Sequence, residues 1–248
     1  MENIALIVDE LVRWLQEKAK EAKAEGLVFG LSGGIDSAVI AGLAKKAFPN
    51  TSLGVIMPCY SGRIDEEHAL LVAGKLDLKT TKVDLSNSFD VLFNSIAEEN
   101  KNKMAITNLK PRLRMTTLYY FAQNNNYLVV GSSNKSEFIT GYFTKHGDSG
   151  VDLLPLATFV KSEIRDLARF LGIPDIIIEK PPTAGLWEDQ TDEKELGFSY
   201  DVLDRYIITG EGPEEIVNKI KRMNTISQHK RVYPPIFKHG DGSFGLKN

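Results

Sequence analysis

The stretch LVFGLSGGIDSAVIAGLAKKAF, residues 27–48, decides the fold of this chain. Its first part, residues 27–31, is a short apolar run that predicts a buried strand. Residues 32–34, Ser-Gly-Gly, form a turn with little side-chain bulk, and apolar side chains then recur at helical spacing, which predicts a helix over 37–48. A strand, a glycine-rich turn and a helix start together direct backbone N–H groups and the positive end of a helix dipole at an anion. The sequence therefore predicts a phosphate-binding loop at this turn.

One acidic residue in this loop predicts the metal that accompanies the phosphate. Ser32 and Ser37 add hydroxyl donors, and Gly33 and Gly34 let a ligand approach the backbone closely. Asp36, however, places a carboxylate where phosphate would sit, and the two anions would repel each other. A divalent cation between them removes that repulsion, so Asp36 predicts Mg²⁺.

Two familiar phosphate motifs do not match this loop. The helix start carries no Gly-Lys-Ser/Thr, which excludes a Walker loop, and the glycines at 30, 33 and 34 do not fit G-x-G-x-x-G. A glycine turn that only joins a strand to a helix is the remaining alternative. The combination of glycines, serines and an aspartate favours the phosphate-binding interpretation over that alternative.

The composition sets broad limits on the class of protein. The 248 residues are enough for one large domain or two small ones, and the 42% hydrophobic content supports a sizeable core. The net charge of −3 argues against a broad nucleic-acid-binding face. The single cysteine, Cys59, excludes an internal disulfide and suits a reducing compartment. The sequence contains no visible secretory signal and no apolar run of membrane-spanning length, so we expect a cytosolic (cytoplasmic) protein.

Outside the loop, strands and helices alternate with short connections. We expect strands at 27–31, 51–57, 80–85 and 127–131. We expect helices at 3–24, 37–48, 66–76 after an N-cap at Asp65, from Ser86 or Ser88 to about Glu99, from Pro111 to Ala122, and at 160–171, 198–209 and 213–228. This alternation predicts an α/β fold, with a doubly wound, Rossmann-like parallel sheet, helices on both faces and C-terminal helices. Ligands bind such sheets at the carboxyl ends of the strands, so the loops after residues 31, 57, 85 and 131 should share one rim.

The second half of the site is expected in residues 132–171, which are rich in glycine, polar and acidic residues. Glu137 lies one short turn past the fourth expected strand, which suits a second carboxylate for the cation. Lys145, Asp148 and Asp152 lie on a glycine-rich loop that is able to close over a ligand. We therefore expect this segment to face the glycine-rich turn across the rim.

Several basic residues are candidates for contacts with an anionic ligand. Lys161 falls in the first turn of the expected 160–171 helix, where the dipole disfavours a cation, so it indicates an anionic partner; an exposed surface lysine is the alternative. Arg112 and Arg114 lie two apart and so point differently, and their spacing does not choose which of them reaches a ligand. Residues 229–231, His-Lys-Arg, follow the last expected helix, where they either cap it or contact an anion.

The motifs resemble those of one superfamily and, within it, of one family. SGGIDS at 32–37 resembles the pyrophosphate loop of the ATP-pyrophosphatase superfamily, which includes GMP, asparagine, argininosuccinate and NAD synthetases and tRNA-thiolating enzymes. The stretches similar to the ammonia-dependent NAD synthetases are RLRM at 112–115, GSSNKSE at 131–137, GYFTKHGDSGVDLLPL at 141–156, KPPTAGLWEDQTDE at 180–193 and HKR at 229–231. This likeness covers about residues 4–235. It implies a single synthetase domain over 1–248, without the N-terminal glutaminase domain of long family members, and therefore free ammonia as the nitrogen source.

The resemblance also implies roles for individual residues. ATP would bind to Gly30, Leu31, Ser32, Gly33, Gly34, Ile35, Asp36, Ser37, Ser132, Lys161 and Thr183. Deamido-NAD would bind to Arg114, Lys145, Asp152, His229 and Lys230. Asp36 and Glu137 would hold Mg²⁺ and, with Lys161, would be the catalytic residues. The family site lies at a homodimer interface, so the resemblance implies a homodimer, with no nucleic acid and no membrane among its partners.

The reaction implied by the resemblance is the amidation of deamido-NAD to NAD with ATP and free ammonia. It passes through an acyl-adenylate and releases AMP and pyrophosphate. Ammonium must lose a proton before it attacks, and Asp148 and Asp152 remain open as the group that helps. One alternative is another adenylylating enzyme, GMP synthetase-like or tRNA-thiolating, which should lack the motifs of residues 131–190. The other is a non-catalytic nucleotide sensor, which need not keep Asp36, Glu137 and Lys161 together.

Overall fold

The computed structural model describes residues 3–96, 102–183 and 191–237 of the chain. At its centre is a four-stranded sheet in the order β3-β2-β1-β4. The strands are β1 (Gly26–Gly30), β2 (Ser52–Ile56), β3 (Thr80–Lys82) and β4 (Tyr127–Val129). Every described pair is parallel, and Val28 on β1 is in register with Leu53 on β2 and Val129 on β4. The expected α/β fold with a parallel sheet is confirmed.

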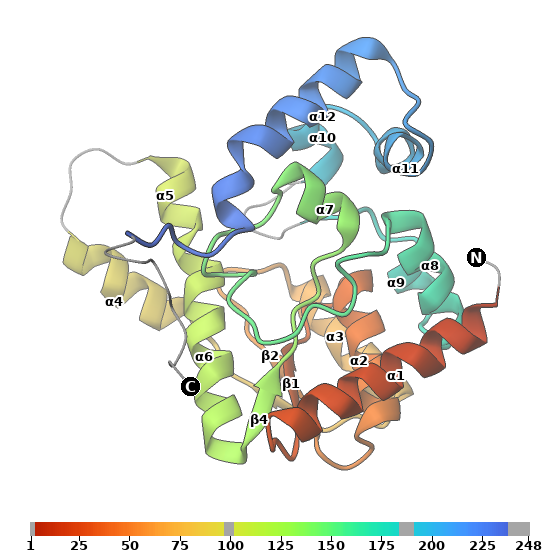
Figure 1. Cartoon of the computed structure of the whole chain (residues 1–248). Helices are drawn as coiled ribbons and strands as arrows, with labels where there is room; N and C mark the ends of the chain where they lie inside the picture. Colours follow the sequence, from red (N-terminus) through yellow and green to blue (C-terminus); the bar gives the residue numbers. More distant parts are fainter. Residues whose placement is uncertain (1–2, 97–101, 184–190, 238–248) are drawn as a thin grey trace.

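Helices cover both faces of this sheet (Figure 1). Neighbouring side chains of a strand point to opposite faces, and in β1 Leu27 and Phe29 belong to one buried cluster while Val28 belongs to another. The helices that complete the first cluster are α1 (Ile4–Glu21), α2 (Ile35–Ala47), α3 (Arg63–Lys75) and α8 (Lys161–Phe170). The helices that complete the second are α4 (Ser86–Ile96) and α6 (Leu109–Asn125). The sheet is therefore doubly wound, as the sequence predicts.

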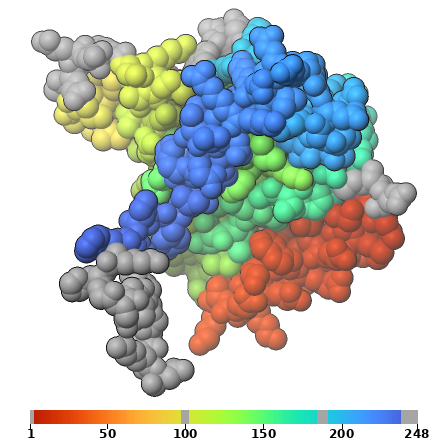
Figure 2. All heavy atoms as spheres, turned by 45° about the horizontal axis from the view of Figure 1, so that its top comes forward, coloured from red at the N-terminus to blue at the C-terminus, as the bar shows by residue number. Residues whose placement is uncertain are grey.

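A third, smaller apolar cluster lies beyond the carboxyl ends of the strands. It consists of Leu196, Phe198, Tyr200, Leu203 and Ile220. The helices around it are α7 (Lys135–Thr140), α10 (Asp192–Leu196), α11 (Tyr200–Thr209) and α12 (Glu214–Ile226), which lie at the top of Figure 1. Helices α11 and α12 form one outer face of the molecule, shown in blue in Figure 2. The remaining short helices are α5 (Lys103–Thr107), α9 (Asp175–Ile178) and the 3₁₀ helix η1 (Gln228–Lys230).

The start of α3 differs from the prediction. The helix begins at Arg63 and follows Gly62, so the expected N-cap at Asp65 is wrong. Asp65 instead lies in the first turn, where its carboxylate accepts a hydrogen bond of 2.6 Å from the ammonium of Lys180. This long-range ion pair holds a negative charge near the favourable end of the helix dipole without capping it.

The end of the third strand also differs. β3 ends at Lys82 rather than at residue 85. The chain nevertheless stays beside β2, because the N–H of Val83 donates to the carbonyl of Ile56 and the N–H of Leu85 donates to that of Pro58. These single bonds do not form a ladder. The expected end of the following helix near residue 99 lies outside the described residues.

Helix α6 is longer than expected, and a short helix before it was not expected at all. α6 runs to Asn125 rather than to residue 122, and Asn126, with a φ of 55°, ends it in the left-handed conformation. α5 is initiated by Asn102, whose side chain accepts from the backbone N–H groups of Met104 and Ala105. Among the described residues, no helix combines the length and the apolar character needed to cross a membrane.

Candidate active site

The glycine-rich turn connects β1 to α2 and is held in shape by its own serines. The hydroxyl of Ser37 donates to the carbonyl of Gly34 at 2.9 Å and accepts from the backbone N–H of Ser32 at 3.2 Å. Gly33 has a φ of 77°, and a Cβ placed there would lie 2.2 Å from the carbonyl oxygen of Asp65. Glycine is required at this position, because α3 packs directly against the turn.

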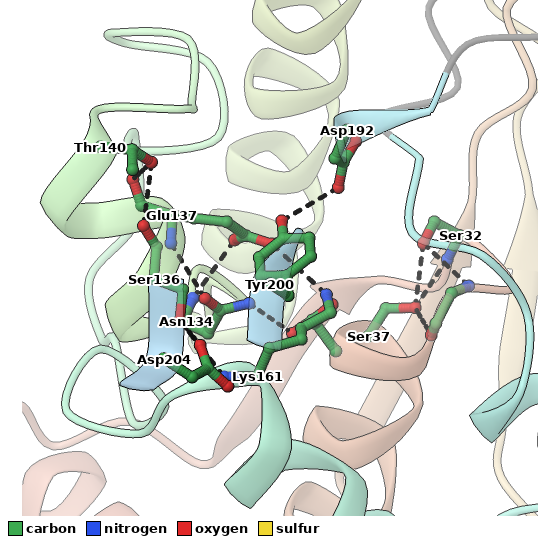
Figure 3. A network of polar contacts seen from close by, with 12 residues as sticks. Ser32, Ser37, Asn134, Ser136, Glu137, Thr140, Lys161, Asp192, Tyr200 and Asp204 are labelled. Atoms are coloured by element: carbon green, nitrogen blue, oxygen red, sulfur yellow. Dashed lines mark hydrogen bonds and ion pairs between the residues drawn. The ribbon is translucent and has the colours of Figure 1, made fainter. Parts of the chain in front are cut away.

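A buried ion cluster lies beside this turn (Figure 3). The ammonium of Lys161, at the start of α8, lies 2.6 Å from Oδ2 of Asp36 and 3.6 Å from Oε1 of Glu137. The Lys161 side chain is only 3% exposed. The side-chain amide of Asn134 donates to Oδ1 of Asp36 at 2.8 Å. The fold thus brings together the three residues for which the resemblance implies catalytic roles. The alternative that Lys161 is an exposed surface lysine is wrong, because its side chain is buried.

The electrostatics of the cluster favour an additional cation. Burial lowers the pKa of Lys161, but the carboxylates of Asp36 and Glu137 outweigh it and raise the pKa overall. Burial raises the pKa of Glu137, the charge of Asp36 raises it further, and Lys161 opposes both effects. Two carboxylates share one ammonium here, and the raised pKa of Glu137 means that a further cation would help to keep both carboxylates ionised. Their oxygens are the hard donors that Mg²⁺ prefers, and one or two carboxylates with substrate phosphates usually complete its site. The residues present fit the metal.

Hydrogen bonds from a distant helix hold the cluster in place. Asn134 and Glu137 form a capping box, in which each side chain accepts from the other residue's backbone N–H. Asp204 on α11 accepts from the hydroxyl of Ser136 and from the backbone N–H of Ser162, both at 2.7 Å. Asp204 therefore ties the starts of α7 and α8, which carry the site residues, to the C-terminal helices.

Sequence reasoning missed a second acidic group next to the cluster. Asp192, the first residue of α10, accepts from the hydroxyl of Tyr200 at 3.1 Å, and Glu195 accepts from that of Tyr142 at 2.5 Å. Burial raises the pKa of Asp192, and Lys161 opposes this. The sequence carried one signal for this group: Thr191 stands at a capping position before an acidic turn, which marks a helix start.

A cavity of about 600 Å³ joins these groups. The expected site residues that line it are Gly30, Leu31, Ser32, Gly34, Ile35, Asp36, Ser37, Arg114, Ser132, Glu137, Lys145, Lys161, Thr183, His229 and Lys230. The start of α2 faces this space and has no side-chain cap, so its first N–H groups remain available to a ligand. A cavity of this size accommodates a nucleotide-sized ligand.

The cavity wall also carries basic side chains, here called the basic wall: Arg114, Lys145, His229 and Lys230. The guanidinium of Arg114 donates to the carbonyl of Met57 at 3.2 Å, which holds its side chain at the wall. The ammonium of Lys230 donates to the carbonyls of Gly141 and Phe143 at 2.7 and 2.8 Å. The basic cluster at 229–231 therefore does not simply cap a helix, because it links the end of α12 to the loop after α7. Of the two arginines left open by the sequence, Arg114 is the more buried.

Asp152 and Gly33 are expected site residues that do not line the cavity. Both carboxylate oxygens of Asp152 are occupied: one accepts from the backbone N–H of Val129 at 2.8 Å and the other from the hydroxyl of Tyr119 at 3.0 Å. These contacts fasten the loop of residues 141–152 to the end of β4. Gly33 shapes the turn, as its contact with α3 requires.

The sequence predicts that the loops after the four strands share one rim, and this prediction is confirmed for three of the four loops. The loops that follow β1, β2 and β4 all contribute to the cavity wall, with Leu31, Ser32, Gly34, Ile35, Asp36 and Ser37 from the first, Met57, Pro58 and Ser61 from the second, and Val130, Gly131, Ser132 and Ser133 from the third. The loop after β3 contributes none, although its Leu85 donates a backbone hydrogen bond to Pro58. In the strand order, β3 is separated from β1 by β2, whereas β2 and β4 both lie directly beside β1, so the carboxyl end of β3 lies farthest from the turn between β1 and α2.

Comparisons with known proteins identify the relatives of the chain. The family model described as NAD synthase matches residues 7–234. The NH(3)-dependent NAD(+) synthetase of Carboxydothermus hydrogenoformans is 53% identical over 231 residues, which cover 92% of this chain and 95% of that protein. The NH(3)-dependent NAD(+) synthetase of Finegoldia magna is 50% identical, covering 95% of this chain and 97% of that protein.

Solved structures agree with this relationship. The structure of NMN synthetase from Francisella tularensis has a TM-score of 0.90 at 34% identity and covers 96% of this chain and 100% of its own. The NH3-dependent NAD synthetase of Campylobacter jejuni, solved with a nitrate ion, has a TM-score of 0.80 at 28% identity with the same coverage. The similarity therefore extends over nearly the whole chain in sequence and in structure.

Proposed function

The chain belongs to the NAD synthase family, and we propose that it is a ligase that converts deamido-NAD, nicotinic acid adenine dinucleotide, to NAD with ATP and free ammonia. The observation that carries this proposal is the buried cluster of Lys161, Asp36 and Glu137 beside the uncapped start of α2. Such a cluster suits phosphoryl chemistry, in which charge has to be neutralised at fixed positions. The names of the relatives support the nitrogen source and the product.

In the first step, the nicotinate carboxylate attacks the α-phosphorus of ATP and pyrophosphate leaves. One anion attacks another, so the site has to offset their repulsion. Lys161 provides an ammonium whose position is set by Asp36 and Glu137. The backbone N–H groups at the start of α2 provide dipoles that point at the phosphates. Both are in place before the reaction, so little reorganisation is required during it.

We propose that Asp36 and Glu137 hold Mg²⁺. When bound, the metal would polarise the phosphate oxygens and neutralise the charge that develops there. Asn134 keeps the carboxylate of Asp36 oriented through its hydrogen bond of 2.8 Å. The hydroxyls of Ser32 and Ser37 stiffen the turn that faces the phosphates.

In the second step, ammonia attacks the carbonyl of the acyl-adenylate and AMP leaves. A free carboxylate is a poor acceptor for ammonia, and adenylylation provides the leaving group, so no covalent enzyme nucleophile is required. Ser132 and Thr183 are the further ATP contacts that we propose. Arg114, Lys145, His229 and Lys230 on the basic wall are the contacts that we propose for deamido-NAD. Both carboxylate oxygens of Asp152 already accept hydrogen bonds, from Val129 and Tyr119. We therefore propose that Asp152 holds its loop in place and does not contact deamido-NAD.

We also propose that the protein is a cytosolic homodimer. Large apolar side chains are exposed on α4, α5 and α6, which lie together at one side of the molecule (Figure 1). They are Val91, Leu92, Ile96, Met104 and Tyr120. An apolar face of this kind suits burial against a second copy. The free thiol of Cys59 suits the reducing conditions of the cytosol. Sedimentation equilibrium measures the assembly, and a monomer at all concentrations would contradict the dimer.

The test of the reaction is an assay of nucleotide products. The purified protein is mixed with ATP, Mg²⁺ and ammonium, with and without deamido-NAD. AMP, pyrophosphate and NAD that form only with deamido-NAD would support the proposal. ADP and phosphate as products would contradict the role of the glycine-rich turn.

Other outcomes would redirect the assignment. AMP formation that does not respond to deamido-NAD would keep the adenylylation chemistry but reject the substrate, and xanthosine monophosphate and tRNA would be tested next. Because one structural neighbour is named as an NMN synthetase, nicotinic acid mononucleotide is included as a competing substrate. ATP binding without any product would favour a nucleotide sensor.

A further inference from the structure

The ammonium of Lys161 has an aromatic neighbour besides its two carboxylates. It lies over the ring of Tyr200, 5.1 Å from the ring centroid. A lysine ammonium within about 6 Å of a ring face is attracted to the negative charge of that face, most strongly where both groups are shielded from water. Here the Lys161 side chain is 3% exposed and Tyr200 is 1% exposed. The ring therefore contributes to the position of the ammonium.

The ring adds a third structural element to those that hold this charge. Asp36 on α2 lies 2.6 Å from the ammonium and Glu137 on α7 lies 3.6 Å from it. Tyr200 is the first residue of α11. The side chain of a lysine is a flexible four-carbon stem, so each further contact narrows the positions that its charge can take. Three helices thus fix one ammonium that a fourth helix, α8, carries.

Tyr200 is itself held firmly. Its hydroxyl donates to Oδ2 of Asp192 at 3.1 Å, and its backbone N–H donates to the side chain of Glu193 at 2.8 Å. Its ring belongs to the third apolar cluster, with Leu203 and Ile220. Figure 3 shows the ring beside Lys161 and the hydroxyl directed at Asp192. A ring fixed in this way is a rigid support for the ammonium.

Helix α11 directs a second residue at the same part of the site. Asp204 follows Tyr200 by four positions, so the two side chains share one face of the helix. Asp204 accepts from the hydroxyl of Ser136 and from the backbone N–H of Ser162, which is next to Lys161 in the chain. The same helix face therefore supports the ammonium of Lys161 through Tyr200 and the backbone beside it through Asp204.

We infer that Tyr200 is a positioning residue for Lys161, and that its aromatic ring carries this role. The inference rests on the proposed function, since Lys161 offsets the charge of the phosphates in the first step. Tyr200 does not line the cavity, so it acts through Lys161 rather than on a substrate. The position of Lys161 matters because a charged group stabilises a transition state only where the charge develops.

The hydroxyl of Tyr200 has a separate contact, which allows the ring to be tested alone. The hydroxyl donates to Asp192. Asp192 also has a hydrogen bond with Tyr142, so it keeps a donor when the hydroxyl of Tyr200 is removed. Tyr200→Phe removes the hydroxyl and keeps the ring, whereas Tyr200→Leu removes both.

The test is the rate of pyrophosphate release with saturating ATP, Mg²⁺ and deamido-NAD, at a temperature well below the Tm of each variant. Tyr200→Leu should lower kcat by about tenfold or more, because the attraction of a buried ring is lost. It should raise the KM for deamido-NAD by less than about threefold, since the basic wall is unchanged. Tyr200→Phe should recover most of the lost rate.

Phe198→Leu is the matched control. Phe198 belongs to the same apolar cluster, is 7% exposed, and has the ammonium of Lys219 over its ring at 5.6 Å. Lys219 is exposed, and neither of these two residues lines the cavity. The control should lower the Tm as Tyr200→Leu does, but it should keep kcat within about twofold of the unsubstituted protein.

The opposing outcomes separate this inference from the proposed function. An unchanged kcat in Tyr200→Leu, equal losses of kcat in Tyr200→Leu and Phe198→Leu, or a Tyr200→Phe variant as slow as Tyr200→Leu would overturn the inference. Failure of the unsubstituted protein to form NAD would instead overturn the proposed function.

A second measurement applies if Tyr200→Leu does not fold. The unsubstituted protein is isotope-labelled at the lysine ε-carbon, and the NMR signal of Lys161 is identified by its loss in Lys161→Arg. Protons above an aromatic face are shielded, so the ε-protons of Lys161 should resonate upfield of those of exposed lysines. A Lys161 signal at the position of the exposed lysines overturns the inference.

Discussion

Lys161 and Asp36, 125 positions apart in the chain, form an ion pair with 2.6 Å between Nζ and Oδ2. The pair joins the start of α8 to the first turn of α2, beside the glycine-rich turn. Lys161 also lies 3.6 Å from Glu137 at the start of α7. Three helix starts thus converge on one buried cluster, and the consequences of this arrangement can be measured.

Removing either carboxylate should abolish the first step. Asp36→Ala or Glu137→Ala each takes away a proposed metal ligand and leaves Lys161 without one of its partners. Pyrophosphate release should fall by at least about 100-fold. Asp201→Ala, on an exposed part of α11, is the control. Near-normal release in either carboxylate variant would show that the metal assignment is wrong.

Loss of a lysine on the basic wall should act on one substrate more than on the other. Lys145 lines the cavity on the loop that follows α7. Lys145→Ala should raise the KM for deamido-NAD by about tenfold and that for ATP by less than about twofold, because a single charged contact is lost. Steady-state kinetics measure both, with the exposed Lys75→Ala as control. Equal effects on the two substrates would argue against the assigned contact.

A methyl group at Gly33 should disturb the turn. Gly33 has a φ of 77°, and the added Cβ would lie 2.2 Å from the carbonyl of Asp65. Gly33→Ala should lower the free energy of unfolding by about 1–3 kcal/mol and weaken ATP binding. Gly74→Ala on α3 is the matched control, since its Cβ meets nothing within 4 Å; it should be neutral or stabilising by up to about 1 kcal/mol. Denaturant titration distinguishes the two, and similar results for both would contradict the packing argument.

The stability of the protein should fall in weak acid because of His68. This histidine on α3 is buried, and neither ring nitrogen has a hydrogen-bond partner among the described residues. Burial lowers its pKa from the ordinary value of 6.5, and the charge of Lys180 lowers it further. A group whose pKa is lowered by folding stabilises the fold above its unfolded pKa, and this contribution is lost as the pH falls through the folded pKa.

The measurement is the Tm of the protein and of His68→Leu as a function of pH. Between about pH 7 and about pH 5 the Tm of the unsubstituted protein should decrease more than that of the variant, because protonation of His68 favours the unfolded state. If both proteins lose stability equally over this range, other groups are responsible and the assignment to His68 is wrong.

Asp204 should matter for rate as well as for stability, although it does not line the cavity. Its oxygens hold Ser136 and the N–H of Ser162, which lie next to Glu137 and Lys161 in the chain. Asp204→Ala should lower the free energy of unfolding by about 1–3 kcal/mol and reduce kcat more than the KM for ATP. Asp204→Asn, which keeps one acceptor, should recover part of both. A variant with reduced stability and unchanged kcat would leave Asp204 with a structural role only.

Much of the fold was predictable from local patterns. The apolar runs and helical periodicities at residues 27–31 and 37–48 correspond to β1 and α2, and the alternation of strands and helices correctly implied a doubly wound parallel sheet. The errors lie at element ends, such as Asp65 and the end of β3. At these ends, single hydrogen bonds to distant residues such as Lys180 and Pro58 decide where the helix or strand begins or ends. Secondary-structure propensity depends on the local sequence and carries no information about such bonds.

By itself the sequence determined the glycine turn, the acidic and basic residues available to the site and the succession of strands and helices along the chain, because these depend on neighbours within a few positions. Only the tertiary structure decided that Lys161 pairs with Asp36 and that both carboxylate oxygens of Asp152 accept hydrogen bonds, from Val129 and Tyr119. These outcomes depend on how helices far apart in the chain pack on the sheet. A buried charge takes the partner that packing places beside it, and that partner is not visible in the local sequence.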